Sequence, residues 1–147
     1  MNESFRLDPR LEADSVPVGR LPLCHLRWMR DARYPWALLV PARPGVVELF
    51  ELSPEDRRAL IEESALVARV LGRLVSAHKT NVATIGNVVS QLHVHVVARF
   101  RDDDAWPRPI WGLHAAKPYD DDTLRAHVEA LRSALAREPD AGFVPSR

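Results

Sequence analysis

The seven residues from 91 to 97, Gln-Leu-His-Val-His-Val-Val, alternate strictly between aliphatic side chains and a second set that contains two histidines. Successive side chains of a β-strand point to opposite faces, so this pattern predicts a strand whose aliphatic residues, at every second position from Leu92, enter the core. His93 and His95 would share the opposite face. An imidazole has an ordinary pKa of about 6.5, so each ring can carry a proton, act as a nucleophile or bind a metal ion near neutral pH.

Three interpretations of the histidine pair are open on the residues alone. The rings could be solvated or hydrogen-bonded at the rim of a sheet, or they could bind zinc, copper or iron with ligands from elsewhere. They could also belong to a catalytic site. We favour catalysis, because residues 81–87 are predicted to form a short strand that ends in Gly86 and Asn87, and the free backbone N–H groups of such a turn could hold an anion.

The stretch from Asn81 to Arg99 resembles the signature of the histidine-triad (HIT) superfamily. That signature is His-φ-His-φ-His-φ-φ, where φ is apolar, preceded by an asparagine and a glycine-containing loop and often followed by an arginine. Its second and third histidines correspond to His93 and His95, whereas Gln91 takes the place of the first. The resemblance extends over most of residues 15–115.

This resemblance implies a nucleotide hydrolase or nucleotidyl transferase that acts at an α-phosphate. The substrate would be a dinucleoside polyphosphate, such as diadenosine tetraphosphate, or a nucleoside phosphoramidate. His93 would be the nucleophile and form a covalent nucleotidyl-histidine, and the main-chain carbonyl of Gln91 would fix its tautomer. His95 would steer or protonate the leaving group. The substrate-binding residues implied in this way are Asn81, Gly86 and Asn87.

A non-catalytic nucleotide-binding or sensing protein of the same fold is the alternative. Gln91 motivates it, as does the loop Ala42-Arg43-Pro44-Gly45, where many relatives place a further histidine. Arg43 could supply a charge to the phosphates there, although such a loop residue is more often solvated. A small metalloprotein is a third interpretation, but the sequence offers no convincing ligands beyond the two histidines, so we expect neither metal nor cofactor.

Composition limits the other partners. The 147 residues suit a single domain, with 46% hydrophobic and 27% charged residues. Twenty basic and twenty acidic residues leave no net charge, which argues against nucleic-acid and membrane-surface binding. The lone Cys24, the lack of an opening signal peptide and the lack of a long apolar run predict a cytoplasmic protein.

The remaining patterns predict an α+β fold. Strands are expected within residues 18–30 and 36–40, and a long helix from the Ser53 cap to about His78. The acidic run at 120–122 opens a C-terminal helix. We therefore expect a HIT-like antiparallel sheet of about five strands, with the long helix packed on it and a closing helix.

The other segments are predicted to be irregular. Residues 1–17 would form a loosely held arm, and residues 139–147 a flexible tail. The aspartates at 102–104 are expected to form a solvated turn rather than a magnesium site, because consecutive carboxylates point in different directions. Trp106 or Trp111 could cover a substrate or simply pack; this aromatic segment, with the HIT resemblance, predicts a homodimer.

Overall fold

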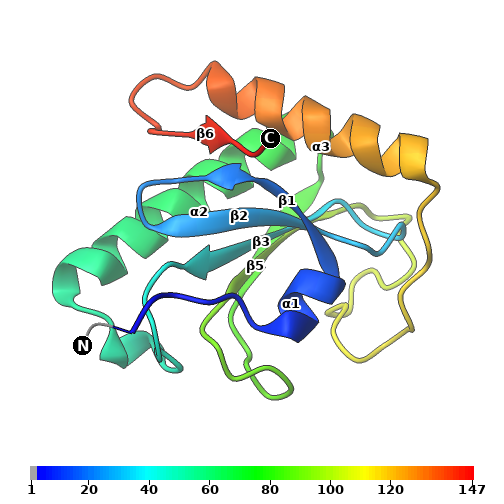
Figure 1. The fold of residues 1–147 in the computed structure, drawn as a ribbon. Coiled ribbons are helices and arrows are strands. Elements are labelled where there is room, and N and C mark those ends of the chain that lie inside the picture. The colour runs from blue at the N-terminus through cyan, green and yellow to red at the C-terminus, as the bar shows by residue number, and fades with distance from the viewer. Residues whose placement is uncertain (1–2) are drawn as a thin grey trace.

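The computed structural model describes residues 3–147, which form one antiparallel sheet and three α-helices (Figure 1). The strands are β1 (Ser15–Arg20), β2 (Cys24–Met29), β3 (Trp36–Pro41), β4 (Lys79–Ala83), β5 (Val94–Arg99) and β6 (Val144–Pro145). The helices are α1 (Pro9–Ala13), α2 (Pro54–Leu74) and α3 (Asp121–Ala136), with a 3-10 turn at Leu49–Glu51. The order across the sheet is β4-β5-β3-β2-β1-β6. The predicted α+β fold with an antiparallel sheet is confirmed, with six strands instead of about five.

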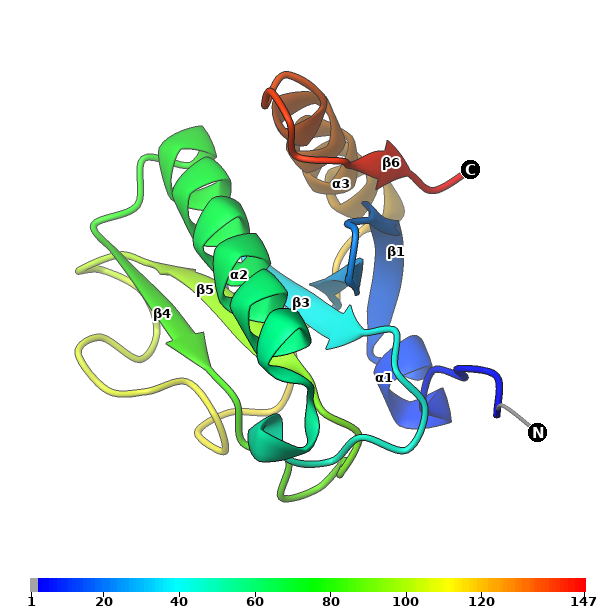
Figure 2. The ribbon, with the colours of Figure 1, turned by 90° about the vertical axis from the view of Figure 1, so that its left-hand side faces the viewer.

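The helices α2 and α3 pack on the same face of the sheet (Figure 2). The Ser53 hydroxyl accepts a hydrogen bond from the Asp56 N–H at 3.1 Å, so α2 starts at its predicted cap. It ends at Leu74, before the expected His78, because Ser76 turns into the left-handed conformation with a φ of 53°. The buried stripes of the two helices include Leu60, Val67, Leu71, Leu131 and Leu135.

The histidine strand β5 lies between β4 and β3. Its predicted alternation is confirmed, because Leu92, Val94 and Val96 enter the core beneath the helices. The regular strand begins only at Val94, because the N–H of Leu92 bonds to the carbonyl of Val46 at 3.0 Å and not to a strand partner. His93 and His95 consequently lie on the face of the sheet opposite α2 and α3.

This opposite face holds two smaller apolar clusters. In one of them, Leu11 of α1 packs with Leu38 of β3. In the other, Val97 of β5 packs with Ile110. His95 pairs with Leu38 and lies one pleat before Val97, so the histidine pair sits between the two clusters.

The N-terminal segment differs from the predicted arm at 1–17, of which residues 1 and 2 lie outside the described residues. Asp8 caps the short helix α1, which buries Leu11 against the sheet. Ser15 then begins β1, and its hydroxyl accepts a hydrogen bond from the buried guanidinium of Arg27 at 2.6 Å. Residues 8–17 are therefore packed on the sheet of the same chain or form part of it, and do not form a loose arm.

The C-terminal segment differs from the predicted tail at 139–147 as well. Within it, β6 pairs with β1 at Gly19. The approach is so close that a Cβ on Gly19 would lie 2.5 Å from the carbonyl oxygen of Val144, which explains the glycine. No helix within residues 3–147 combines the length and the apolar character needed to cross a bilayer.

Candidate active site

Two imidazoles lie side by side at the start of β5, on the face of the sheet opposite α2 and α3. The ring centroids of His93 and His95 are 4.9 Å apart, with an angle of 75° between the ring planes. Each residue is only 6% exposed. In such a largely water-excluded place, burial and hydrogen bonds decide the protonation state of each ring.

The backbone of Gln91 fixes the tautomer of His93. Its carbonyl oxygen lies 2.6 Å from His93 Nδ1. A carbonyl can only accept, so Nδ1 carries the proton and donates it. The lone pair of the neutral ring is then on Nε2, the nitrogen that can act as a nucleophile. This contact is the one that the HIT resemblance implies, and it involves only the main chain of Gln91.

Trp36 fixes His95 in the opposite sense. The indole Nε1–H of Trp36, on β3, donates to His95 Nδ1 at 3.0 Å. An indole N–H can only donate, so Nδ1 carries the lone pair and the neutral ring has its proton on Nε2. Burial, and secondarily the neighbouring His93, lower the pKa of His95 to about 3, so the ring is neutral near pH 7. The pair thus combines a lone pair on Nε2 of His93 with an N–H on Nε2 of His95.

The side chain of Gln91 is engaged elsewhere. Its Oε1 accepts a hydrogen bond from the N–H of Asp8, and its Nε2 donates to the carbonyl of Arg6, both at 2.8 Å. Arg10 adds a bond from its guanidinium to the carbonyl of Val88 at 2.9 Å. The residue at the first motif position therefore ties the N-terminal segment to the strand that bears the histidines.

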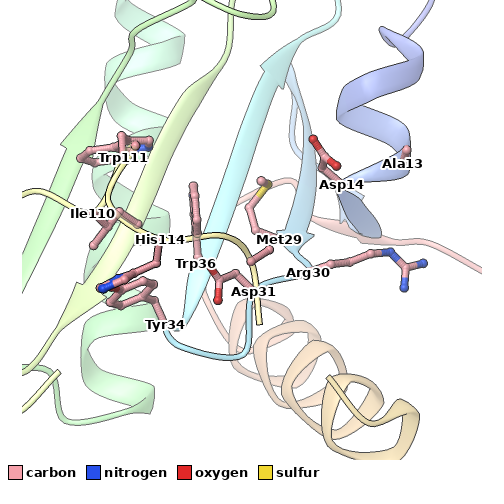
Figure 3. A pocket seen from close by; sticks show the side chains of 12 residues that line it. Ala13, Asp14, Met29, Arg30, Asp31, Tyr34, Trp36, Ile110, Trp111 and His114 are labelled. Atoms are coloured by element: carbon pink, nitrogen blue, oxygen red, sulfur yellow. The ribbon is translucent and has the colours of Figure 1, made fainter. Parts of the chain in front are cut away.

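A cavity of about 300 Å³ has an aromatic lining that contacts His95, although neither imidazole lines the cavity itself (Figure 3). Trp36 and Trp111 line it, and their rings lie 5.5 and 5.4 Å from the imidazole of His95. The hydroxyl of Tyr34 and the Nε1 of Trp111 are buried without a hydrogen-bond partner within residues 3–147. Two unpartnered donors in the wall of an aromatic cavity favour a ligand that has both a flat apolar surface and hydrogen-bond acceptors.

Charged groups line the same cavity. They are Asp14, Arg30 and Asp31, which Figure 3 shows with the aromatic side chains. Asp31 Oδ1 accepts hydrogen bonds from the N–H groups of Arg33 at 3.0 Å and Lys117 at 3.2 Å, which joins the turn before β3 to the segment after Trp111. Its second oxygen has no protein partner in residues 3–147 and can accept from a ligand hydroxyl.

The predicted substrate-binding residues lie on β4 and on the loop that follows it. Asn81 is on β4, and its side-chain oxygen accepts a hydrogen bond from Arg99 Nη1 at 2.8 Å. Gly86, with a φ of +73°, and Asn87 belong to the loop that joins β4 to β5. No hydrogen bond links any of the three to the imidazoles within residues 3–147. The loop is tied to the site by Thr84, whose hydroxyl donates to the carbonyl of His93 at 2.8 Å.

The aspartate turn is not fully solvated, contrary to expectation. Asp103 forms a buried ion pair with Arg99, with Nε to Oδ2 at 2.8 Å. Arg99 also lies 5.7 Å from the ring centroid of Trp106, which contacts His78 and not the histidine pair. Of the two tryptophans considered from the sequence, only Trp111 therefore borders the candidate site.

Two alternatives considered from the sequence were a phosphate contact by Arg43 and a metal site at the two histidines. Arg43 pairs with Asp56 of α2 through two hydrogen bonds of 2.7 and 3.0 Å, so its charge is already satisfied. Within residues 3–147, no group of three or more His, Cys, Asp and Glu side chains is placed to hold a metal ion. His93 and His95 consequently lack a third ligand of this kind there.

The HIT domain family model matches residues 10–102, well over half of the chain. The chain belongs to the HIT family. HIT proteins generally bind nucleotides and act on them, and the histidine pair on β5 is where this chain carries the family motif.

Solved bacterial HIT structures are similar over nearly their whole length. A HIT protein from Sinorhizobium meliloti 1021 is 44% identical, covering 89% of this chain and 97% of its own, with a TM-score of 0.87. One from Bradyrhizobium japonicum is 39% identical, covering 90% and 98%, with a TM-score of 0.87. One from Marinobacter aquaeolei VT8 is 36% identical, covering 92% and 98%, with a TM-score of 0.89. A search of curated proteins found no match.

Three residues of the candidate site were not predicted from the sequence: Asp31, Tyr34 and Trp36. The first two lie between the strands expected within residues 18–30 and 36–40, and Trp36 was expected only as the first residue of the second strand. The period-two pattern of β3 could have placed Trp36 on one face together with Leu38. It could not have shown that this face is the one shared with His95, since that depends on which strands are neighbours.

Proposed function

We propose that this protein is a nucleotide hydrolase or nucleotidyl transferase that reacts at an α-phosphorus through His93. The observation that carries this proposal is the pair of opposite tautomers. An imidazole nitrogen with a free lone pair lies beside a second imidazole that presents an N–H, so a nucleophile and a hydrogen-bond donor are available together.

The reaction would proceed in two steps. Nε2 of His93 forms a bond to the α-phosphorus, and the bond from phosphorus to the leaving atom breaks with its electron pair going to that atom. Water or another acceptor then attacks the phosphorus and releases His93. The ring becomes cationic in the covalent nucleotidyl-histidine, and the carbonyl of Gln91 stabilises it by accepting from Nδ1–H throughout.

The nucleoside would occupy the aromatic cavity. Trp36 and Trp111 supply faces for a base, and the orphaned donors of Tyr34 and Trp111 match acceptors on a base or sugar. The free oxygen of Asp31 suits a ribose hydroxyl. The α-phosphate would then lie at Nε2 of His93, with the loop that contains Gly86 and Asn87 and the side chain of Asn81 as its further donors.

We also propose that the protein works as a homodimer. Strand β4 ends the sheet, so its outer edge has no strand partner within residues 3–147. Val82 on this strand is 51% exposed, and Ile85 and Val88 after it are exposed as well. An unprotected strand edge flanked by apolar side chains is suited to pairing with a second copy.

A nucleotide-binding protein without turnover is the second candidate. The observation that favours it is the low exposure of both imidazoles, together with the diversion of the Gln91 side chain to the N-terminal segment. Such a protein would bind the nucleotide in the aromatic cavity and leave the phosphates unchanged.

Intact-mass measurement after quenching with denaturant at alkaline pH, where the P–N bond of a nucleotidyl-histidine is stable, tests the proposal. Incubation with diadenosine tetraphosphate should add an adenylyl group to the protein, and replacing His93 with Ala should remove both the adduct and the turnover. Arg125→Ala, on the exposed face of α3, is the matched control and should behave like the parent. Calorimetry with adenosine monophosphate separates the second candidate, for which binding would occur without adduct or product.

A further inference from the structure

Trp36 restricts what His95 can do chemically, and this inference rests on the proposed function. A histidine that protonates a leaving group must begin as an imidazolium, give up the proton on Nε2 and keep the one on Nδ1. In this structure the Nδ1 lone pair already accepts the indole N–H of Trp36 at 3.0 Å. Protonating Nδ1 would set two N–H groups against each other and leave the indole without its acceptor.

The surroundings of His95 offer no compensation for a positive charge. On β3 it meets Trp36 and Leu38, on β4 its pairing partner is Ala83, and the segment after the sheet contributes Trp111. Within residues 3–147, the ring of His93 is the titratable group in contact with His95, and a charge on it would oppose a second one. No carboxylate hydrogen-bonds or ion-pairs with His95 within residues 3–147.

His95 is therefore a neutral hydrogen-bond donor. Giving up its only proton would create an imidazolate anion, which nothing in this apolar setting stabilises. It can orient the α-phosphate or the leaving atom through Nε2–H, but it cannot transfer a proton to it. Trp36 is thus a positioning residue that acts through His95.

The two substrate classes implied for the site differ in this requirement. When a bond from phosphorus to a bridging oxygen breaks, the electron pair goes to a phosphate oxygen, a weak base with a pKa of about 6, which leaves without a proton at neutral pH. When a bond from phosphorus to nitrogen breaks, the nitrogen leaves as an amine and must gain a proton. Amines are strongly basic, with a pKa of about 10 for an ammonium group such as that of Lys.

We infer that the hydrogen bond from Trp36 to His95 makes this protein selective for phosphoanhydride nucleotides, such as dinucleoside polyphosphates, over nucleoside phosphoramidates. The electron and proton balance of anhydride cleavage is complete without a general acid. Phosphoramidate cleavage needs one, and His95 does not supply it. Because general-acid catalysis is typically worth 10²–10⁴-fold, the selectivity should be at least about 10²-fold in kcat/KM.

The test compares diadenosine tetraphosphate with adenosine 5′-phosphoramidate for the parent and for Trp36→Phe. Phenylalanine keeps an aromatic wall but has no N–H, so Nδ1 of His95 becomes free to take a proton. The ratio of kcat/KM should shift toward the phosphoramidate by about tenfold or more, and the alkaline limb of its pH profile, where a general acid loses its proton, should move to higher pH. Trp111→Phe is the matched control: it also replaces an indole beside His95, and effects on adenosine binding cancel in the ratio.

Nitrogen-15 NMR of the imidazoles in the parent protein gives a readout that does not depend on activity. His95 should show its proton on Nε2 and His93 on Nδ1. A proton on Nδ1 of His95, or equal kcat/KM values for the two substrates in the parent, would overturn the inference, as would an unchanged ratio in folded Trp36→Phe. If the parent turns over neither substrate, the proposed function fails, whereas the NMR result still decides whether Trp36 fixes His95.

Discussion

The side-chain oxygen of Gln91 accepts a hydrogen bond from the backbone N–H of Asp8 at 2.8 Å. The Nε2 of the same side chain donates to the carbonyl of Arg6, so this amide bonds to the N-terminal segment at two backbone positions, residues 6 and 8. The segment that carries His93 and the start of the chain are thereby joined across 83 positions of sequence.

Replacing Gln91 with Leu should release this segment without abolishing turnover. The two side-chain bonds are lost, which should lower the free energy of unfolding by about 1–3 kcal/mol. The carbonyl that orients His93 belongs to the main chain and remains. Hydrogen exchange at the amide of Asp8 should become fast, and an amide that stays protected would show that other contacts hold the segment. Gln91→Glu keeps the acceptor for Asp8 and should protect that amide partly.

Substitution of the two histidines should have unequal effects. His93→Ala removes the nucleophile and should abolish both turnover and covalent adduct. His95→Ala removes one hydrogen-bond donor near the reacting phosphate, for which a loss of about 10²-fold in kcat is expected. Rapid-quench kinetics with diadenosine tetraphosphate measures both. A folded His93→Ala protein with the parent rate would rule out the assignment.

Acid should destabilise the protein through His95. The unfolded chain binds a proton at this residue with an ordinary pKa of about 6.5, whereas in the fold, burial and His93 lower the pKa to about 3. Below about pH 6.5 the unfolded state therefore binds more protons, and the free energy of unfolding should fall with pH until about pH 3, by at most about 1.4 kcal/mol per unit. Above about pH 6.5 the group contributes no pH dependence.

Urea denaturation of the parent and of His95→Gln, between about pH 7 and pH 4, measures this term. Glutamine can still accept from Trp36 but does not titrate, so its curve should fall less steeply. Parallel curves for the two proteins would show that His95 is not kept neutral by the fold.

The ion pair between Asp103 and Arg99 should matter for stability. Burial would raise the pKa of Asp103, but hydrogen bonds from Arg99 and from three backbone N–H groups outweigh it and lower the pKa to about 2. Asp103→Asn leaves a buried guanidinium without its counter-ion and should cost about 3–5 kcal/mol. Asp102→Asn, at the exposed neighbouring position, is the control and should be neutral in the same thermal unfolding measurement.

The exposed edge of β4 predicts that two copies of the protein pair through this strand. Light scattering should find a dimer for the parent, and Val82→Glu should convert it to a monomer, because a charge would be buried at the proposed interface. Ile61→Glu changes an equally apolar residue, 60% exposed on α2, and should leave the dimer intact. A parent that remains monomeric at micromolar concentration would contradict the proposal.

Local patterns in the sequence were sufficient for the main elements. The alternation around His93 correctly identified the two faces of β5, and Ser53 correctly marked the start of α2, because both depend on residues a few positions apart. The bond from Trp36 to His95 joins residues 59 positions apart and depends on β3 and β5 being neighbours in the sheet. Asp103 was misjudged because its environment depends on a buried Arg99.

The N-terminal segment was missed for a related reason. A five-residue helix gives little periodicity, and Leu11 is its sole buried residue. Its partners are Leu38 of β3 and Gln91, which precedes β5, and both lie far along the chain. Such a segment becomes visible only once the sheet is assembled.

The peptide carbonyl of Gln91 accepts a hydrogen bond from His93, whereas the side chain of Gln91 bonds to Asp8. Orienting the imidazole and holding the N-terminal segment are therefore chemically independent at this position. Any residue with an extended backbone could present that carbonyl. Mutation at this position is consequently free to explore new side-chain partners without disturbing the ring it orients. A search that demands three histidine side chains would discard proteins of this kind, although the bond that selects the tautomer of His93 is intact.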